Sequence, residues 1–182
     1  MRLLLALLLA AAPAPAIAQP ASSKVDYAGF RKLTEDVDAY RRSRLIGWAQ
    51  FERKAREPGV LVLDARSANA FAAGHIRGAV NLPFTDFTAE SLARVIGRSD
   101  RPILIYCNNN FRNDVEPVRL KALPLALNIQ TFINLVGYGY GNVYELGEAI
   151  DLDDPKVGWV KGEAARQRAA IRALLPGVSS GG

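Results

Sequence analysis

The sequence predicts an α/β domain with three layers, in which a central, mostly parallel sheet is flanked by helices. Short apolar runs typical of buried strands lie at residues 60–63, 79–82, 103–106 and 143–146. Segments with helical spacing of apolar residues alternate with these runs. A continuous apolar run after a turn signal indicates a strand of a parallel sheet that is buried on both faces.

The N-terminus is typical of a secretory signal peptide over residues 1–18. Arg2 precedes an apolar run of leucine and alanine. Ala16 and Ala18 are small residues at the two positions that a signal peptidase recognises. The run is shorter than the about 20 residues that span a bilayer. We therefore expect cleavage after Ala18, a periplasmic or secreted protein, and no stable membrane insertion afterwards. An uncleaved anchor is the alternative.

Residues 19–58 are expected to form an N-terminal helical segment packed on the core. Apolar residues recur at helical spacing from residue 25 to residue 56, and Pro58-Gly59 ends the pattern. After the first strand, Ser67 is expected to cap a short helix that ends at Gly74.

Further helices are expected at residues 89–96 and 128–136, each followed by glycine. Residues 59–160 would form the domain itself. A C-terminal helix and a flexible tail would occupy residues 161–182. Residues 113–126 contain two prolines and are interpreted as an insertion.

Charge and cysteine content narrow the function classes. The net charge of +5 comes from 23 basic and 18 acidic residues that are scattered along the chain. Nucleic-acid binding needs a concentrated basic face, so we expect no nucleic-acid partner. The single cysteine, Cys107, cannot close an internal disulfide. It is therefore a reactive thiol, an intermolecular pairing partner or an inert buried residue.

Cys107 directly follows the most strand-like run, at the end of the strand where open α/β sheets bind ligands. The segment Cys107-Asn108-Asn109-Asn110-Phe111-Arg112, here called the Cys107 loop, is polar and ends in a cation. If it curls around the sulfur, its N–H groups form an anion-binding nest that favours the thiolate. Arg112 then offers a planar fork to an oxyanion. The alternative is a cysteine that merely ends a core strand beside a solvated arginine.

Several segments together resemble the rhodanese family. They are Asp64-Ala65-Arg66, the string Gly-His-Ile-Arg-Gly-Ala-Val-Asn-Leu-Pro at residues 74–83, a strand ending in Cys107 with Arg112 five residues later, and the glycine-to-strand segment at residues 139–147. Rhodaneses are sulfurtransferases that pass through a cysteine persulfide. The resemblance implies Cys107 as the sulfur carrier, Arg112 as the substrate anchor, and Asn108, Asn109, Asn110 and Phe111 as the loop that contacts substrate.

The resemblance also assigns supporting roles. Asp64 and Arg66 are expected to brace the end of a strand, and His75 is expected to be structural. With three asparagines and one cation, the loop attracts a thiosulfate dianion less than a more basic loop would. The insertion at residues 113–126 stands where the family's helix usually begins, so it could lie over the loop as a lid.

We therefore expect a thiosulfate sulfurtransferase-like enzyme that takes sulfur from a small donor and passes it to a thiophilic acceptor or acceptor protein. A non-catalytic binding or sulfur-carrier module is the alternative. A phosphatase or arsenate reductase is less favoured, since the related phosphatases have a loop one residue longer. The chain lacks a His/Cys cluster, so no metal is expected, and no cofactor is implied.

Overall fold

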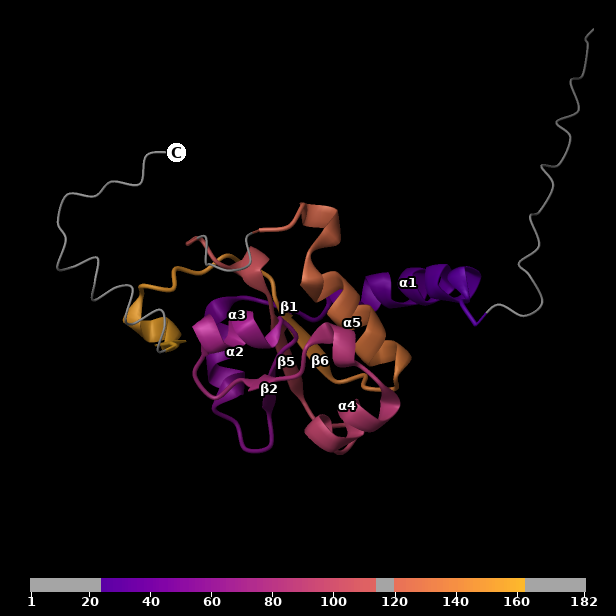
Figure 1. Cartoon of the computed structure of the whole chain (residues 1–182), viewed down its shortest axis with the longest axis horizontal. Coiled ribbons are helices and arrows are strands. Elements are labelled where there is room, and N and C mark those ends of the chain that lie inside the picture. The colour runs from indigo at the N-terminus through magenta and orange to yellow at the C-terminus, as the bar shows by residue number, and fades with distance from the viewer. Residues whose placement is uncertain (1–23, 114–119, 163–182) are drawn as a thin grey trace, which may run out of the picture.

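A five-stranded parallel sheet forms the centre of the fold (Figure 1). The structure is a computed structural model, and it describes residues 24–113 and 120–162. The strand order is β1-β6-β5-β2-β4. The strands are β1 (Leu45–Ile46), β2 (Leu61–Asp64), β4 (Val80–Asn81), β5 (Ile103–Tyr106) and β6 (Val143–Leu146). The predicted fold class is confirmed, and so are the four predicted strands.

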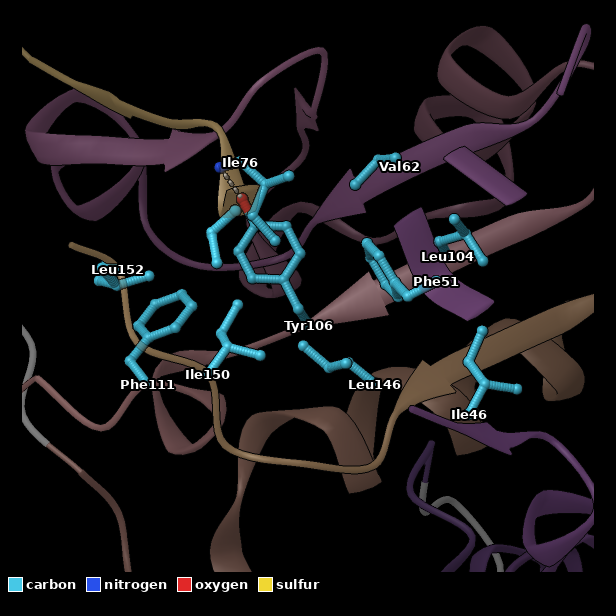
Figure 2. Close-up of a cluster of buried hydrophobic side chains, with 11 residues drawn as sticks. Ile46, Phe51, Val62, Ile76, Leu104, Tyr106, Phe111, Leu146, Ile150 and Leu152 are labelled. Carbon is cyan, nitrogen blue, oxygen red and sulfur yellow. Dashed lines mark hydrogen bonds between the residues drawn. The ribbon is translucent and has the colours of Figure 1, made fainter. Parts of the chain in front are cut away.

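One face of the sheet is covered by α2 (Trp48–Ala55), with α3 (Ala68–Ala73) on the same side of the sheet in Figure 1. Phe51 of α2 packs here against Val62 and Leu104 of the central strands. Figure 2 shows how this apolar cluster extends past the end of β5 to Tyr106 and Phe111. The core therefore reaches the end of the sheet where Cys107 lies.

The opposite face is covered by α4 (Ala89–Ile96) and α5 (Leu127–Gly137), and α1 (Tyr27–Arg42) packs on α5. Leu92 and Ile96 of α4, together with Phe132 and Leu135 of α5, pack against the inner strands. These four side chains are almost completely buried. The sheet is thus the middle of three layers.

Local capping signals act as the sequence predicts. The Ser67 side chain accepts a hydrogen bond of 3.2 Å from the Ala70 backbone N–H and begins α3, which ends at Gly74. The predicted helices at residues 89–96 and 128–136 correspond to α4 and α5. Gly97 ends α4 at a positive φ of 78°, which glycine adopts without steric cost.

Three short strands were not predicted. β1 interrupts the expected helical segment between α1 and α2, and it pairs with β6. β3 (Gly74–Ile76) and β7 (Trp159–Lys161) form a separate antiparallel pair. A two- or three-residue strand carries too little periodicity to be recognised in a sequence. Pairing with distant segments defines these strands.

The pair formed by β3 and β7 needs a glycine at position 74. A Cβ there would lie 2.6 Å from Nε1 of the Trp159 indole.

The signal peptide predicted at residues 1–18 and most of the C-terminal helix and tail predicted at residues 161–182 lie outside the described residues. Within the part of the chain that the structure describes, no helix has the length and apolar character to cross a membrane.

Candidate active site

Cys107 lies directly after β5, at the carboxyl end of a central strand, where ligand sites of parallel sheets occur. Its side chain is 2% exposed, and it borders a pocket of about 290 Å³. The pocket is lined by Ala65, Arg66, Ser67, Pro83, Phe84, Thr85, Cys107, Asn108, Asn109, Lys121, Leu127 and Gln130. A small molecule in this pocket would therefore lie beside the thiol.

Backbone N–H groups from two segments point at the sulfur of Cys107. Burial raises the pKa of the thiol above its ordinary value, and hydrogen bonds from the backbone N–H groups of Asn128, Asn109 and Leu127 oppose that rise. Leu127 and Asn128 form the first turn of α5, whose unpaired N–H groups favour a negative charge. The site therefore contains donors for a thiolate, although burial keeps the resting thiol protonated.

Asn110 fixes the Cys107 loop from beneath. Its side-chain oxygen accepts hydrogen bonds of 2.9 Å from the Cys107 backbone N–H and 2.9 Å from the Asn128 side chain. Its side-chain nitrogen donates to the backbone oxygens of Leu146, at 2.8 Å, and Glu148, at 3.2 Å. One amide thus joins the loop, α5 and the segment after β6.

The second half of the Cys107 loop differs from the sequence expectation. Asn108–Asn110 form one turn of 3₁₀ helix, after which Phe111 pairs with Ile150 as a parallel bridge. The Arg112 backbone N–H donates to the Ile150 oxygen at 2.8 Å. This pairing directs Phe111 and Arg112 toward the segment after β6. Leu127 and Asn128 of α5 direct further backbone N–H groups at the sulfur, beside those of Asn109 and Asn110 from the loop.

Three of the expected substrate-contacting residues consequently lie away from the pocket. Phe111 is 2% exposed and points into the core beside Tyr106 (Figure 2). Asn110 is engaged by its four hydrogen bonds. Arg112 is exposed, and its Nε donates to the Ala149 oxygen at 3.1 Å. Only Asn108 and Asn109 of the predicted loop contacts line the pocket with Cys107.

A buried ion pair lies beneath the loop. The Arg66 guanidinium contacts the Asp64 carboxylate at 2.6 Å, with side chains 3% and 0% exposed. The Tyr106 hydroxyl donates to Asp64 at 2.6 Å and accepts from the Ile76 backbone N–H at 3.2 Å. The latter bond is the dashed line in Figure 2. Burial, with the Asp64 charge, raises the pKa of Tyr106 well above its ordinary value, so this hydroxyl stays a donor.

Arg66 links this pair to the loop. Its Nη1 donates to the Asn108 side chain at 3.2 Å, and its Nη2 donates to the Gly74 oxygen at 2.7 Å. Burial lowers the pKa of Arg66, but the hydrogen bond and charge of Asp64 outweigh it, so the pKa is raised and the guanidinium stays charged. Most of its donors are already engaged by protein acceptors, which favours a bracing role.

His75 lies outside the pocket lining. Its ring stacks on Phe71 with the ring centres 3.9 Å apart, and its Nδ1 lies 3.0 Å from the Phe71 backbone oxygen. These contacts connect β3 to the end of α3. His75 therefore contributes contacts between elements of the fold and does not line the pocket.

The insertion reaches the pocket through Lys121. The Asn109 side chain donates to the Lys121 backbone oxygen at 2.7 Å and accepts from its N–H at 3.2 Å. This pair of bonds docks the described end of the insertion on the Cys107 loop. Lys121 is exposed and lines the pocket, so the insertion brings a cation to the site. Sequence reasoning assigned no role to this residue.

Sequence reasoning also missed a buried carboxylate near Cys107. Glu145 of β6 is 4% exposed, and Arg41 of α1 contacts it with two hydrogen bonds of 2.6 Å. The signal was an acidic residue within the apolar strand at residues 143–146. A charge in such a strand is buried unless the sheet edge exposes it, and a buried charge needs a partner.

Among the described residues, no group of three potential ligands for a metal ion occurs.

Comparison with known families adds to this geometry. A family model described as a rhodanese-like domain matches residues 48–150. The chain belongs to the rhodanese-like domain family. The matched segment of this rhodanese-like chain contains the whole Cys107 loop, α5 and β6, whereas α1 and β1 precede it. No curated protein matches the chain.

Comparison with solved structures found similar chains from Anabaena sp. and Bacillus halodurans. The Alr3790 protein from Anabaena sp. is 19% identical, and the match covers 67% of this chain and 96% of that one with a TM-score of 0.43. The rhodanese-like domain of the same protein, in a second structure, is 20% identical, with coverages of 67% and 92% and a TM-score of 0.37. The BH2092 protein from Bacillus halodurans is 18% identical, with coverages of 74% and 81% and a TM-score of 0.39.

Proposed function

We propose that this rhodanese-like protein is a sulfurtransferase that carries sulfane sulfur as a persulfide on Cys107. The observation that carries the proposal is the set of backbone N–H groups from Asn109, Leu127 and Asn128 at the sulfur of a pocket-lining cysteine. Such donors favour the thiolate form of Cys107, which is the nucleophile that sulfur transfer needs. The family membership of the chain supports the same chemistry.

The proposed reaction has two steps. Cys107 loses its proton to solvent, and the thiolate attacks the outer sulfur of a thiosulfate-type donor. The S–S bond of the donor breaks, sulfite leaves with the bonding electron pair, and Cys107 holds the persulfide. A thiophilic acceptor such as cyanide or a thiolate then attacks the outer sulfur. The S–S bond to Cys107 breaks, and the thiolate is regenerated.

We assign recognition of the donor's anionic group to Lys121. Arg112 lies outside the pocket, and the Arg66 guanidinium is engaged by Asp64, Gly74 and Asn108. Lys121 is the exposed cation among the described lining residues. Its ammonium acts as a flexible point charge, which suits anions of differing shape better than one planar fork would.

A persulfide assay tests the proposal. The full chain is incubated with thiosulfate, mercaptopyruvate or polysulfide, and intact mass spectrometry measures the product. We expect addition of one sulfur atom that cyanide removes as thiocyanate. Cys107→Ser is the control, and it should fold normally and take up no sulfur. If none of the donors adds sulfur to the protein, the proposal that it is an enzyme is wrong.

A non-catalytic binding or sulfur-carrier module is the second candidate. The burial of Cys107, which raises the pKa of its thiol, favours it because a protonated thiol attacks donors slowly. Such a module would accept sulfur from a partner's persulfide and fail to turn over small donors. The same mass measurement, made with a protein persulfide as donor, separates the two candidates.

We also propose that the protein is exported to the periplasm or the cell exterior. Support comes from the sequence alone, through the apolar run at residues 3–12 and the small residues Ala16 and Ala18. Expression of the full chain with fractionation should yield an exported form that begins at Gln19. N-terminal analysis that finds Met1 in the exported pool would overturn cleavage.

A further inference from the structure

A largely buried ion pair joins the N-terminal helix α1 to the strand beside the candidate active site. Arg41, in the last turn of α1, contacts both carboxylate oxygens of Glu145 at 2.6 Å. The side chains are 24% and 5% exposed. Because α1 precedes the segment that matches the family model, this contact joins the part of the chain before that segment to the matched domain.

Glu145 lies on the same side of the sheet as Cys107. In the parallel register, Glu145 of β6 pairs with Ile105 of β5. Residues two apart on a strand face the same side, and the backbone of Cys107 remains extended at φ −145° and ψ −178°. Ile105 packs in the apolar cluster beneath α5, as does Val143, two residues before Glu145. The Glu145 carboxylate and the Cys107 thiol therefore share the layer between sheet and α5.

We propose that Arg41 is a positioning residue for the nucleophile, which neutralises Glu145 and thereby lets Cys107 ionise. The inference rests on the proposed role of Cys107 as a nucleophile. With Arg41 in place, the thiolate forms beside a paired carboxylate. Without Arg41, the thiolate would form beside an uncompensated negative charge, which disfavours it. Docking of α1 thus sets the reactivity of the site.

The charges around Cys107 make this coupling specific to Glu145. Burial and the nearby Glu145 charge both raise the pKa of the thiol, with burial the larger cause. α5 contains no charged residue. Arg66 is paired with Asp64 on the β2 side, and Lys121 approaches from the segment before α5. Arg41 is the partner that the described residues offer to Glu145.

Additional contacts hold α1 in this position. The Tyr40 hydroxyl donates to the Gly141 backbone oxygen, and its ring lies 6.1 Å from Phe132 of α5. The Arg44 guanidinium lies over the Tyr40 and Tyr144 rings at 4.8 and 4.7 Å. These contacts allow Arg41 to be changed while the helix stays docked, so its charge can be tested separately from the placement of α1.

The test is a pH profile of Cys107 alkylation by iodoacetamide, a neutral reagent, followed by intact mass. Arg41→Ala should move the profile to higher pH and slow alkylation at neutral pH by about threefold to tenfold, the effect of one nearby charge. Glu145→Gln should move the profile to lower pH. The double variant Arg41→Ala/Glu145→Gln should follow Glu145→Gln, because no charge remains to be neutralised.

Arg42→Ala is the matched control, since the neighbouring Arg42 pairs with the exposed Asp38 at 3.0 Å. It should leave the profile unchanged. Equal profiles for Arg41→Ala and Arg42→Ala would overturn the inference. Slowing by Arg41→Ala that persists in the Glu145→Gln background would also overturn it and assign Arg41 a purely structural part. Alkylation needs no sulfur donor, so these outcomes are independent of persulfide transfer.

Discussion

The side-chain oxygen of Asn110 accepts a hydrogen bond of 2.9 Å from the backbone N–H of Cys107. The same oxygen accepts from the side chain of Asn128, whose own backbone N–H points at the Cys107 sulfur. Asn110 therefore holds both the nucleophile and the helix end that faces it. The position tolerates only a side chain with an acceptor and a donor in this geometry.

Asn110→Ala should destabilise the fold and misplace the loop. It leaves the Cys107 N–H and the Leu146 oxygen buried without their partner, and we expect a loss of about 2–4 kcal/mol in the free energy of unfolding. Urea unfolding measures this. Asn134→Ala removes the side chain of a half-buried asparagine on α5 and should cost far less. Equal losses in both variants would contradict an anchoring role for Asn110.

Asp64→Ala should be among the most destabilising substitutions in the chain. It leaves the Arg66 guanidinium, 3% exposed, without its carboxylate, and breaking a buried pair costs about 3–5 kcal/mol. Asp100→Ala is the matched control, because its pair with Arg98 is exposed and contributes about 0–1 kcal/mol. Chemical denaturation compares the two. If Asp64→Ala lowers the free energy of unfolding by less than about 1 kcal/mol, solvent must hydrate the Arg66 guanidinium in place of the carboxylate.

Lys121→Ala should slow sulfur loading from thiosulfate by about fivefold, the effect of an exposed charge pair. Loading from a neutral organic trisulfide should change little, because that donor brings no anion. Arg112→Ala is the comparison, and it should have the smaller effect since Arg112 lies outside the pocket. The second-order loading rate by mass spectrometry is the measurement. A larger effect of Arg112→Ala would restore the sequence-based assignment of the anchor.

Reactivity of Cys107 should depend on pH in a defined direction. Burial raises the pKa of the native thiol above its ordinary value, so the midpoint of the native alkylation profile should lie above about pH 8.5, the midpoint expected for an unfolded cysteine. The native state then holds its proton while the unfolded state ionises. Stability from this group is present below the unfolded pKa and is lost as pH rises toward the folded pKa.

The control for this profile is the same chain in denaturant, where the thiol is exposed and should titrate at its ordinary value. A native profile that levels off at lower pH than the unfolded one would show that the N–H groups of Asn128, Asn109 and Leu127 outweigh burial. That result would strengthen the enzyme candidate over the carrier module.

Features that depend on near neighbours along the chain were predictable from the sequence. Ser67 and Gly74 delimit α3, and the apolar run at residues 103–106 becomes the buried central strand with Cys107 at its end. A cap or a strand of this kind involves residues only a few positions apart, so its signal survives in a linear pattern. The family resemblance follows from the same local strings.

The groups that meet at the sulfur come together only through long-range packing. The helix α5 was predicted, but the placement of its N-terminus against the Cys107 sulfur depends on contacts such as that of Asn128 with Asn110, 18 residues apart. Phe111 and Arg112 turn away because Ile150 pairs with the loop. No local pattern contains these contacts, since each depends on where a distant segment packs.

The contact of Arg41 with Glu145 spans 104 residues, so it depends on how distant segments pack. The buried acid in β6 shows in the sequence that some cation must approach it, because an unpaired charge is costly in the core. Which of the 23 basic residues does so is settled only when α1 packs on α5 and carries Arg41 to the sheet.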